Sequence, residues 1–335
     1  GSDGGVYKSN NPSAGWTDIG YGLAITEFYR FGGTPQNAAY YVGGAQDNGT
    51  NIIEGPAIPD LVMTHVEGAD GMEAAIDPTN QNIIYGTIQN GSLIRSVNKG
   101  SSWSNIKPNN LGAGPWVTPY VLKPGQPTHI LAAYSDVGVS TNSGSSWTNL
   151  SNGTVNGGTS RAVAYAPSNT NYIYVVKSSK VWKSTNSGSN WTDITSGLPG
   201  GTYTYIAVKP TNPNHIFVTR STYSSNSQIF ESTNGGSTWT NISGTNLPNV
   251  PANCVVYEPG SADGIYLGTD VGVFYKDDNL VDWIDFSTGL PFARVMEMEI
   301  NPLANRLRAA TYGRSIWESD LYGSDCATNL TLTGT

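Results

Sequence analysis

Acidic side chains recur in the turns of this sequence, and a pair of them could act on a glycosidic bond. Asp70 and Glu73 lie in the segment 68–73, just before an apolar run that is typical of a strand, and Asp47 lies in a turn shortly upstream. Glycoside hydrolysis needs two carboxyl groups, about 5–5.5 Å apart in retaining enzymes and about 6.5–9.5 Å apart in inverting enzymes. Asp47, Asp70 and Glu73 are therefore the predicted catalytic candidates.

Further Asp-x-Gly turns, together with aromatic and basic residues at equivalent places, could bind a ligand. A carboxylate in such a turn either bonds its own backbone or faces a ligand, and both interpretations stay open. Aromatic faces and arginine forks suit sugars and acidic sugars. Packing or a solvated rim is the alternative for each residue. The predicted ligand-binding residues are Tyr29, Arg30, Trp116, Asp136, Arg161, Tyr203, Asp270, Arg294 and Arg314.

The composition restricts the class of protein that carries these residues. Of 335 residues only 13% are charged, the formal net charge is −8, and 40 are glycine. The aromatic content of 10% argues against disorder, and the acidic excess gives no basic stripe for nucleic acid. No run of about 18 apolar residues could span a membrane. We therefore expect an extracytoplasmic all-β protein that binds no nucleic acid.

The cysteines and histidines give no support for a metal or cofactor site. Cys254 and Cys326 belong to no Cys/His cluster, and His65, His129 and His215 are scattered. We predict no metal and no cofactor. Cys254 is expected to be a buried thiol, and a disulfide with Cys326 is the alternative in an oxidising compartment.

An internal repeat determines the predicted architecture. Four segments read Ser-x-Asn-x-Gly-Ser-x-Trp and end in Trp103, Trp147, Trp191 and Trp239, at intervals of 44, 44 and 48 residues. Apolar runs ending in proline, such as Ala164-Tyr165-Ala166-Pro167, recur between them. Short strands and turns at this spacing predict four strands per unit. Seven such units predict a seven-bladed β-propeller of four-stranded antiparallel blades.

The repeat itself suggests roles for its residues. The Asn is expected to cap backbone N–H groups, the Gly to adopt positive φ, and the Trp to pack between blades. Here the chain resembles the Asp-box family, also called bacterial neuraminidase repeats, with Asn in place of Asp. The resemblance implies the fold but no single function, because sialidases, xyloglucanases, sortilin-like receptors and photosystem assembly factors share it. Thr269-Asp270-Val271-Gly272 resembles the catalytic turn of xyloglucanases, which pair carboxylates across two propellers.

Three further segments, 43–50, 68–73 and 311–317, are similar to secreted Bacteroidetes propeller proteins that often end in a type IX secretion sorting domain. This resemblance implies a secreted or surface-displayed protein and no particular reaction.

The two ends of the chain bear on how the ring closes. The strand at 295–300 is followed by two strands and no recognisable fourth, so Trp16–Ile19 is expected to supply it and to join the N- and C-terminal strands. Residues 1–323 would then form one propeller domain, and 324–335 would begin a linker. Deletion of residues 1–20 should destabilise such a ring. Residues 5–9 also read as a third strand, which indicates a chain cut from a longer protein.

The predicted function is non-catalytic binding of polysaccharide or extracellular protein by a monomer. Binding would use the face formed by two kinds of connection, from the fourth strand of one blade to the first of the next (D–A) and from second to third (B–C). The alternative is a xyloglucanase-like glycoside hydrolase with paired carboxylates on that face. No complete catalytic set is recognisable, which favours binding.

Overall fold

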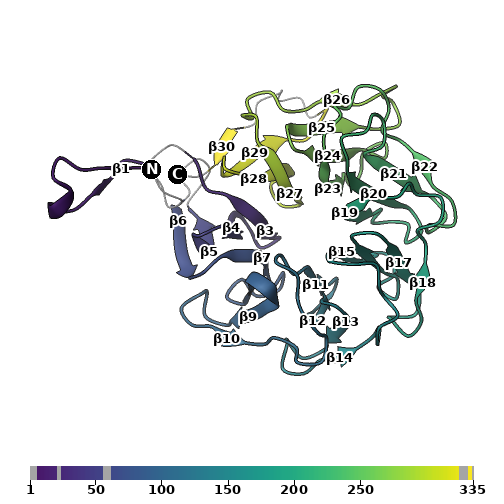
Figure 1. The fold of residues 1–335 in the computed structure, drawn as a ribbon, viewed down its shortest axis with the longest axis horizontal. Helices are drawn as coiled ribbons and strands as arrows, with labels where there is room; N and C mark the ends of the chain where they lie inside the picture. Colours follow the sequence, from purple (N-terminus) through teal and green to yellow (C-terminus); the bar gives the residue numbers. More distant parts are fainter. Residues whose placement is uncertain (1–5, 21–23, 56–61, 324–330, 334–335) are drawn as a thin grey trace.

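The chain folds into a ring of seven blades (Figure 1). The structure is a computed structural model that describes residues 6–20, 24–55, 62–323 and 331–333. Each blade is an antiparallel sheet of four strands, here lettered A to D from the centre outward. The predicted seven-bladed β-propeller is therefore confirmed.

Strands of one letter occupy equivalent places in every blade. The A strands surround the centre of the ring: β3 (Phe28–Thr34), β7 (Gly71–Ile76), β11 (Tyr120–Lys123), β15 (Ser160–Tyr165), β19 (Thr202–Val208), β23 (Ala252–Tyr257) and β27 (Arg294–Asn301). The B strands are β4 (Asn37–Ala45), β8 (Ile84–Ile88), β12 (Gln126–Ala133), β16 (Ile173–Lys177), β20 (Ile216–Ser221), β24 (Ile265–Thr269) and β28 (Arg306–Tyr312). The C strands are β5 (Gly49–Glu54), β9 (Ser92–Ser96), β13 (Val137–Ser140), β17 (Val181–Ser184), β21 (Ile229–Ser232), β25 (Gly272–Lys276) and β29 (Ile316–Asp320). The D strands are β6 (Val62–Glu67), β10 (Ser104–Asn105), β14 (Thr148–Asn149), β18 (Thr192–Asp193), β22 (Thr240–Asn241), β26 (Ile284–Asp285) and β30 (Thr331–Thr333).

Helical structure in these described ranges is limited to two 3₁₀ turns, η1 (Pro12–Ala14) and η2 (Gln89–Gly91). Neither the described turns nor any other described segment forms a helix with the length and apolar character that a membrane crossing requires.

The core lies between the blades, because each sheet packs against a neighbour on both faces. Every residue of β16 and of β24 is buried, so these B strands lack the alternation of apolar and polar residues, and β16 is apolar up to Lys177 at its end. Cys254 is 1% exposed in this core, as predicted for a buried thiol. Cys326 lies outside the described residues, and its pairing with Cys254 stays a prediction.

The repeated turn connects strands C and D as its sequence predicts. In the second copy, Asn142 Oδ1 accepts a hydrogen bond from the Ser146 N–H at 2.8 Å, and Ser140 Oγ accepts one from the Gly144 N–H at 2.8 Å. Gly144 adopts a φ of 88°, in the left-handed region that favours glycine. Trp147 donates its indole N–H to the Ile106 carbonyl at 2.9 Å, which links its blade to the preceding one.

Ring closure differs from the expectation drawn from the sequence. The fourth strand of the last blade is β30, which pairs with β29 and lies in the tail that was expected to begin a linker. The segment at 16–19 lies instead in a separate hairpin of β1 (Tyr7–Lys8) and β2 (Thr17–Asp18), which projects from the ring (Figure 1). The prediction that an N-terminal strand completes this blade was wrong, because β30 occupies the edge it would need.

The last and first blades meet without exchanging a strand. The Phe31 N–H donates to Glu297 Oε2 at 2.8 Å, and the Gly33 N–H donates to Glu299 Oε2 at 2.6 Å. Carboxylates of β27 thus satisfy backbone donors of β3 across the junction.

Candidate ligand-binding site

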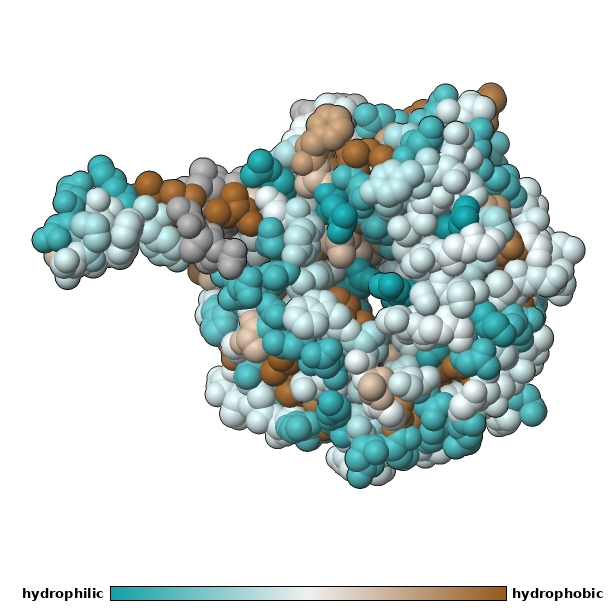
Figure 2. Space-filling model, viewed as in Figure 1, coloured by the Kyte–Doolittle hydropathy of each residue, from teal (hydrophilic) through white to brown (hydrophobic). Residues whose placement is uncertain are grey.

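One face of the ring carries a pocket of about 430 Å³ at its centre. Its walls come from the starts of β3, β15, β19, β23 and β27, from the loop before β11, and from the turns after β20 and β24. These are D–A and B–C connections, the face on which the sequence predicted binding. Figure 2 shows the molecule hollowed at the centre of the ring.

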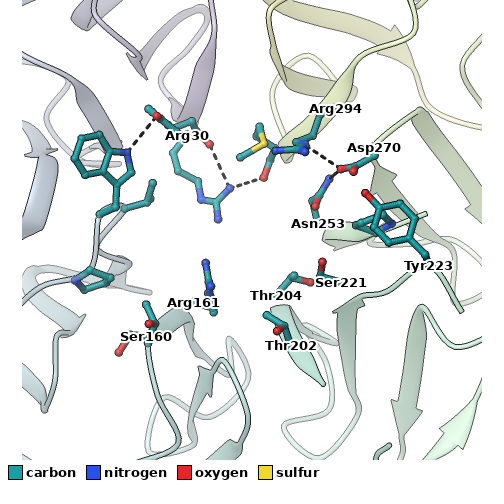
Figure 3. A pocket seen from close by; sticks show the side chains of 17 residues that line it. Arg30, Ser160, Arg161, Thr202, Thr204, Ser221, Tyr223, Asn253, Asp270 and Arg294 are labelled. Carbon is teal, nitrogen blue, oxygen red and sulfur yellow. Dashed lines mark hydrogen bonds and ion pairs between the residues drawn. The ribbon is translucent and has the colours of Figure 1, made fainter. Parts of the chain in front are cut away.

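The pocket brings together six of the nine predicted ligand-binding residues: Tyr29, Arg30, Trp116, Arg161, Asp270 and Arg294. They come from β3, the loop before β11, β15, the turn after β24, and β27 (Figure 3). Residues distant in sequence therefore meet around one cavity.

Trp116 and Tyr29 form an aromatic side of the pocket. Trp116 is 46% exposed, and its indole N–H donates to the Tyr29 hydroxyl at 3.1 Å. The Tyr29 hydroxyl in turn donates to Gln46 Oε1. This hydrogen-bonded chain fixes the Trp116 ring while leaving much of its surface available.

The three pocket arginines differ in their partners. Arg294 Nε lies 2.9 Å from Asp270 Oδ1, and the Arg294 side chain is 51% exposed. Arg30 donates from Nη1 to the Tyr29 and Met296 carbonyls, and its Nε lies 3.5 Å from Glu73 Oε2. Arg161 is exposed, and its side chain makes no hydrogen bond or ion pair with any described residue.

Glu73 belongs to a buried cluster next to the pocket instead of to its lining. Burial and the neighbouring Glu297 raise the pKa of Glu73 well above its usual value, although Arg30 opposes that shift. Burial raises the pKa of Glu297 to about 7, with Arg30 again opposing it. The Tyr205 hydroxyl donates to Glu297 Oε1 at 3.2 Å. Burial alone would lower the pKa of Arg30, but the two carboxylates raise it.

The other two catalytic candidates lie in one turn region. Asp70 is 8% exposed, and its Oδ1 accepts a hydrogen bond from the Asp47 N–H at 2.7 Å. Asp47 adopts a φ of 54° in its turn. Neither residue lines the pocket, and Asp70 stabilises the turn that contains Asp47.

Three predicted binding residues lie away from the pocket. Burial opposes ionisation of Asp136, but donors from Ser151, Asn149 and the Gly153 N–H lower its pKa, so its carboxylate caps a turn. Tyr203 is 1% exposed and donates to the Pro199 carbonyl. Arg314 is exposed at the turn between β28 and β29.

The pocket also contains residues that the sequence did not identify. Tyr223 is 72% exposed, and the Asn253 amide donates to Asp270 Oδ1 at 2.9 Å. Hydroxyl side chains also line the pocket: Thr159, Ser160, Thr202, Thr204 and Ser221. The long B–C connection at 222–228 was the available signal for Tyr223, because the equivalent connection in the preceding blade spans only 178–180.

The described part of the chain contains no group of three or more His, Cys, Asp or Glu side chains placed to hold a metal ion. The polar chemistry that the pocket offers therefore comes from arginine, hydroxyl and amide groups with a single carboxylate, Asp270.

No family model matches the sequence, and no curated protein matches it. Solved structures do match its fold. An ancestral GH74 enzyme is 18% identical with a TM-score of 0.72, over 97% of this chain and 47% of that one. The GH74 xyloglucanase from Xanthomonas campestris is 16% identical with a TM-score of 0.64, over 97% of this chain and 58% of that one.

The WD40 β-propeller domain of Doa1 also matches, with 10% identity and a TM-score of 0.65, over 88% of this chain and 92% of that one. At these identities the likeness shows the fold alone. The chain spans about half the length of the GH74 enzymes that it resembles.

Proposed function

We propose that the chain is a secreted or surface-displayed propeller that binds polysaccharide through the central pocket without catalysing a reaction. One observation carries this proposal: exposed Trp116 and Tyr223 stand beside hydroxyl and guanidinium groups in a single open cavity. Aromatic faces stack on sugar rings, and a few placed polar groups select their hydroxyls.

The carboxylates support binding over hydrolysis. A glycosidase needs two carboxyl groups across the scissile bond. Asp270 is the one carboxylate in the described lining, and it is ion-paired with Arg294. Glu73 is buried against Arg30, and Asp70 bonds a backbone amide.

The alternative is a glycoside hydrolase in which Asp270 and Glu73 act together. It is favoured by the raised pKa of Glu73, since a general acid must keep its proton near the working pH. The similarity of the fold to GH74 enzymes is compatible with either function.

Binding is tested by substituting an aromatic residue of the pocket. Trp116→Ala should weaken binding to any polysaccharide that the native chain retains by on the order of tenfold, because truncating an aromatic anchor removes its whole stacking surface. Affinity electrophoresis against xyloglucan, mannan, alginate and polygalacturonate measures this change.

The matched control is Trp16→Ala, because Trp16 is 62% exposed on the projecting hairpin and outside the pocket. It should leave binding unchanged. Equal affinity of the native chain and Trp116→Ala would exclude the pocket as the binding site.

The hydrolase alternative is tested with the same polysaccharides by measuring the release of reducing ends. Release that disappears in both Glu73→Gln and Asp270→Asn would establish it and reject non-catalytic binding. Release that survives Asp47→Ala, Asp70→Ala and Glu73→Ala would leave an enzyme with a different site.

A further inference from the structure

Positive charge is concentrated in the pocket of a chain that is acidic as a whole. The formal net charge is −8, yet the pocket lining contains three arginines and one carboxylate. Opposite charge placed at a recognition site raises both specificity and the rate of encounter with a ligand. The pocket therefore favours a negatively charged ligand, although the molecule as a whole is negatively charged.

Arg161 supplies a cation whose charge no described residue compensates. It follows Ser160 at the start of β15, and Figure 3 shows its side chain extending into the pocket toward Arg30 on the opposite wall. A guanidinium group has five N–H donors, and those of Arg161 are all available to a ligand. Because Arg161 is exposed, its donors are solvated by water, which an anionic ligand can replace with two parallel hydrogen bonds.

Arg294 provides a second set of donors. Its ion pair with Asp270 uses Nε, and its two Nη groups make no hydrogen bond within the described residues. Arg30 is different, because Glu73 and two backbone carbonyls already engage it. Arg161 on β15 therefore has all of its side-chain donors available, and Arg294 on β27 has its two Nη groups available.

Lys177 adds a further positive charge behind this wall. It is 1% exposed, and its Nζ donates to Ser160 Oγ at 2.8 Å and to the Ser135 carbonyl at 2.8 Å. Ser160 lines the pocket and itself donates to the Tyr134 carbonyl, so the ammonium group lies behind the wall, one hydrogen bond from a lining side chain.

We propose, on the basis of the binding function argued above, that the ligand is a uronic-acid polysaccharide whose carboxylates meet Arg161 and Arg294. Arginine binds carboxylates through two parallel N–H donors. The exposed rings of Trp116 and Tyr223 and the surrounding hydroxyls favour a sugar chain over an acidic peptide.

The test compares polygalacturonate with its fully methyl-esterified form, since the two share a backbone and differ in charge. Titration calorimetry should show that polygalacturonate binds roughly 10- to 100-fold more tightly, as expected for a charge-assisted hydrogen bond. Arg161→Gln should remove most of this difference. Lys8→Gln is the control, because it deletes the same charge on the projecting hairpin.

Each other outcome identifies what fails. Equal binding of both polymers, unaffected by Arg161→Gln, overturns the anionic ligand and leaves polysaccharide binding intact. Binding of carrageenan without polygalacturonate assigns the pocket to sulfate and rejects the uronate. Binding of poly-glutamate with no polysaccharide rejects both proposals. Thermal melting of Arg161→Gln, an exposed substitution, should match the native chain and so exclude unfolding as the cause.

Discussion

Arg30 lines the pocket and also interacts with two buried carboxyl groups, Glu73 and Glu297, which compete for its single positive charge. Glu73 pairs with Arg30, and Glu297 accepts hydrogen bonds from the Phe31 N–H and the Tyr205 hydroxyl. Two carboxylates beside one guanidinium cannot both ionise at low cost, because the second repels the first. The cluster therefore holds a proton up to nearly neutral pH, and this has consequences for stability.

Stability should fall as pH rises through the titration of this cluster. Burial raises the pKa of Glu297 from 4.5 to about 7, so the folded state binds more protons than the unfolded state. The stabilisation that the bound proton of Glu297 gives the folded state is complete below pH 4.5 and is lost by about pH 7. Glu297→Gln should flatten this dependence by on the order of 2–3 kcal/mol, as measured by urea unfolding between pH 4.5 and 8.

Asp278→Asn is the control for this series, since it changes an exposed carboxyl group outside the cluster. Its stability curve should run parallel to that of the native chain. Parallel curves for Glu297→Gln as well would show that Glu297 titrates normally in the folded protein.

Whether a predicted residue lines the pocket depends on which face of its strand the side chain occupies. Side chains alternate between the two faces of a strand. Thr202 and Thr204 line the pocket, so Tyr203 between them points into the core and is buried. Asp136 accepts hydrogen bonds from Asn149 in the following D strand and from Ser151 in the turn after it. The local sequence Asp136-Val137-Gly138 does not predict these partners. Sequence position identifies the face of the ring that carries the pocket, but not which side chains reach its centre.

The projecting hairpin has the same structure as the outer half of a blade. Tyr7 pairs with Asp18, and Trp182 pairs with Asp193 at the same place in β17 and β18. The Ile19 N–H donates to the Val6 carbonyl at 2.8 Å, as Ile194 does to Val181 at 2.9 Å. This degenerate copy of the repeat therefore forms its local hairpin as a two-stranded sheet, with no inner strand among the described residues.

Burial of the repeat tryptophan should decide its contribution to stability. Trp283 is 1% exposed and donates to the Ile242 carbonyl at 2.7 Å, whereas Trp16 is 62% exposed. Trp283→Ala should cost about 3–5 kcal/mol, and Trp16→Ala no more than about 0.5 kcal/mol. Guanidinium unfolding measures both. A large loss in Trp16→Ala would mean that this ring is covered in solution.

The elements were predictable wherever the repeat is clear. The Asn and Gly positions define the C–D turn in the four blades that carry the complete repeat, and the spacing of the tryptophans gives the number of blades. The strand at 331–333 carries no such signature, so it could not be identified as the outer strand of the last blade. The segment at 9–16 keeps Ser9, Asn11 and Trp16 of the signature but has Ser13 where the repeat has Gly, and the strand that follows it, Trp16–Ile19, was expected at that place.

At the scale of the whole ring, closure depends on contacts between complete blades. β27 packs beside β3, and its carboxylates accept from the Phe31 and Gly33 N–H groups. The Ser315 N–H also donates to the Thr26 carbonyl at 3.0 Å. Because these bonds join blades that each already have four strands, the ring gains its closure without the segment at 16–19.

Removal of the hairpin should therefore leave the ring intact, contrary to what the sequence indicated. A chain of residues 21–335 should melt within about 2 °C of the full chain and elute at the same oligomeric state, because the bonds that close the ring, from β3 to β27 and from Ser315 to Thr26, lie outside the segment it removes. Glu299→Ala in the full chain should instead lower the melting temperature by roughly 2–6 °C, since the Gly33 N–H is left without its acceptor. Calorimetry and light scattering measure both variants. Aggregation or early melting of the shortened chain, with Glu299→Ala unaffected, would return the closing role to the N-terminal segment.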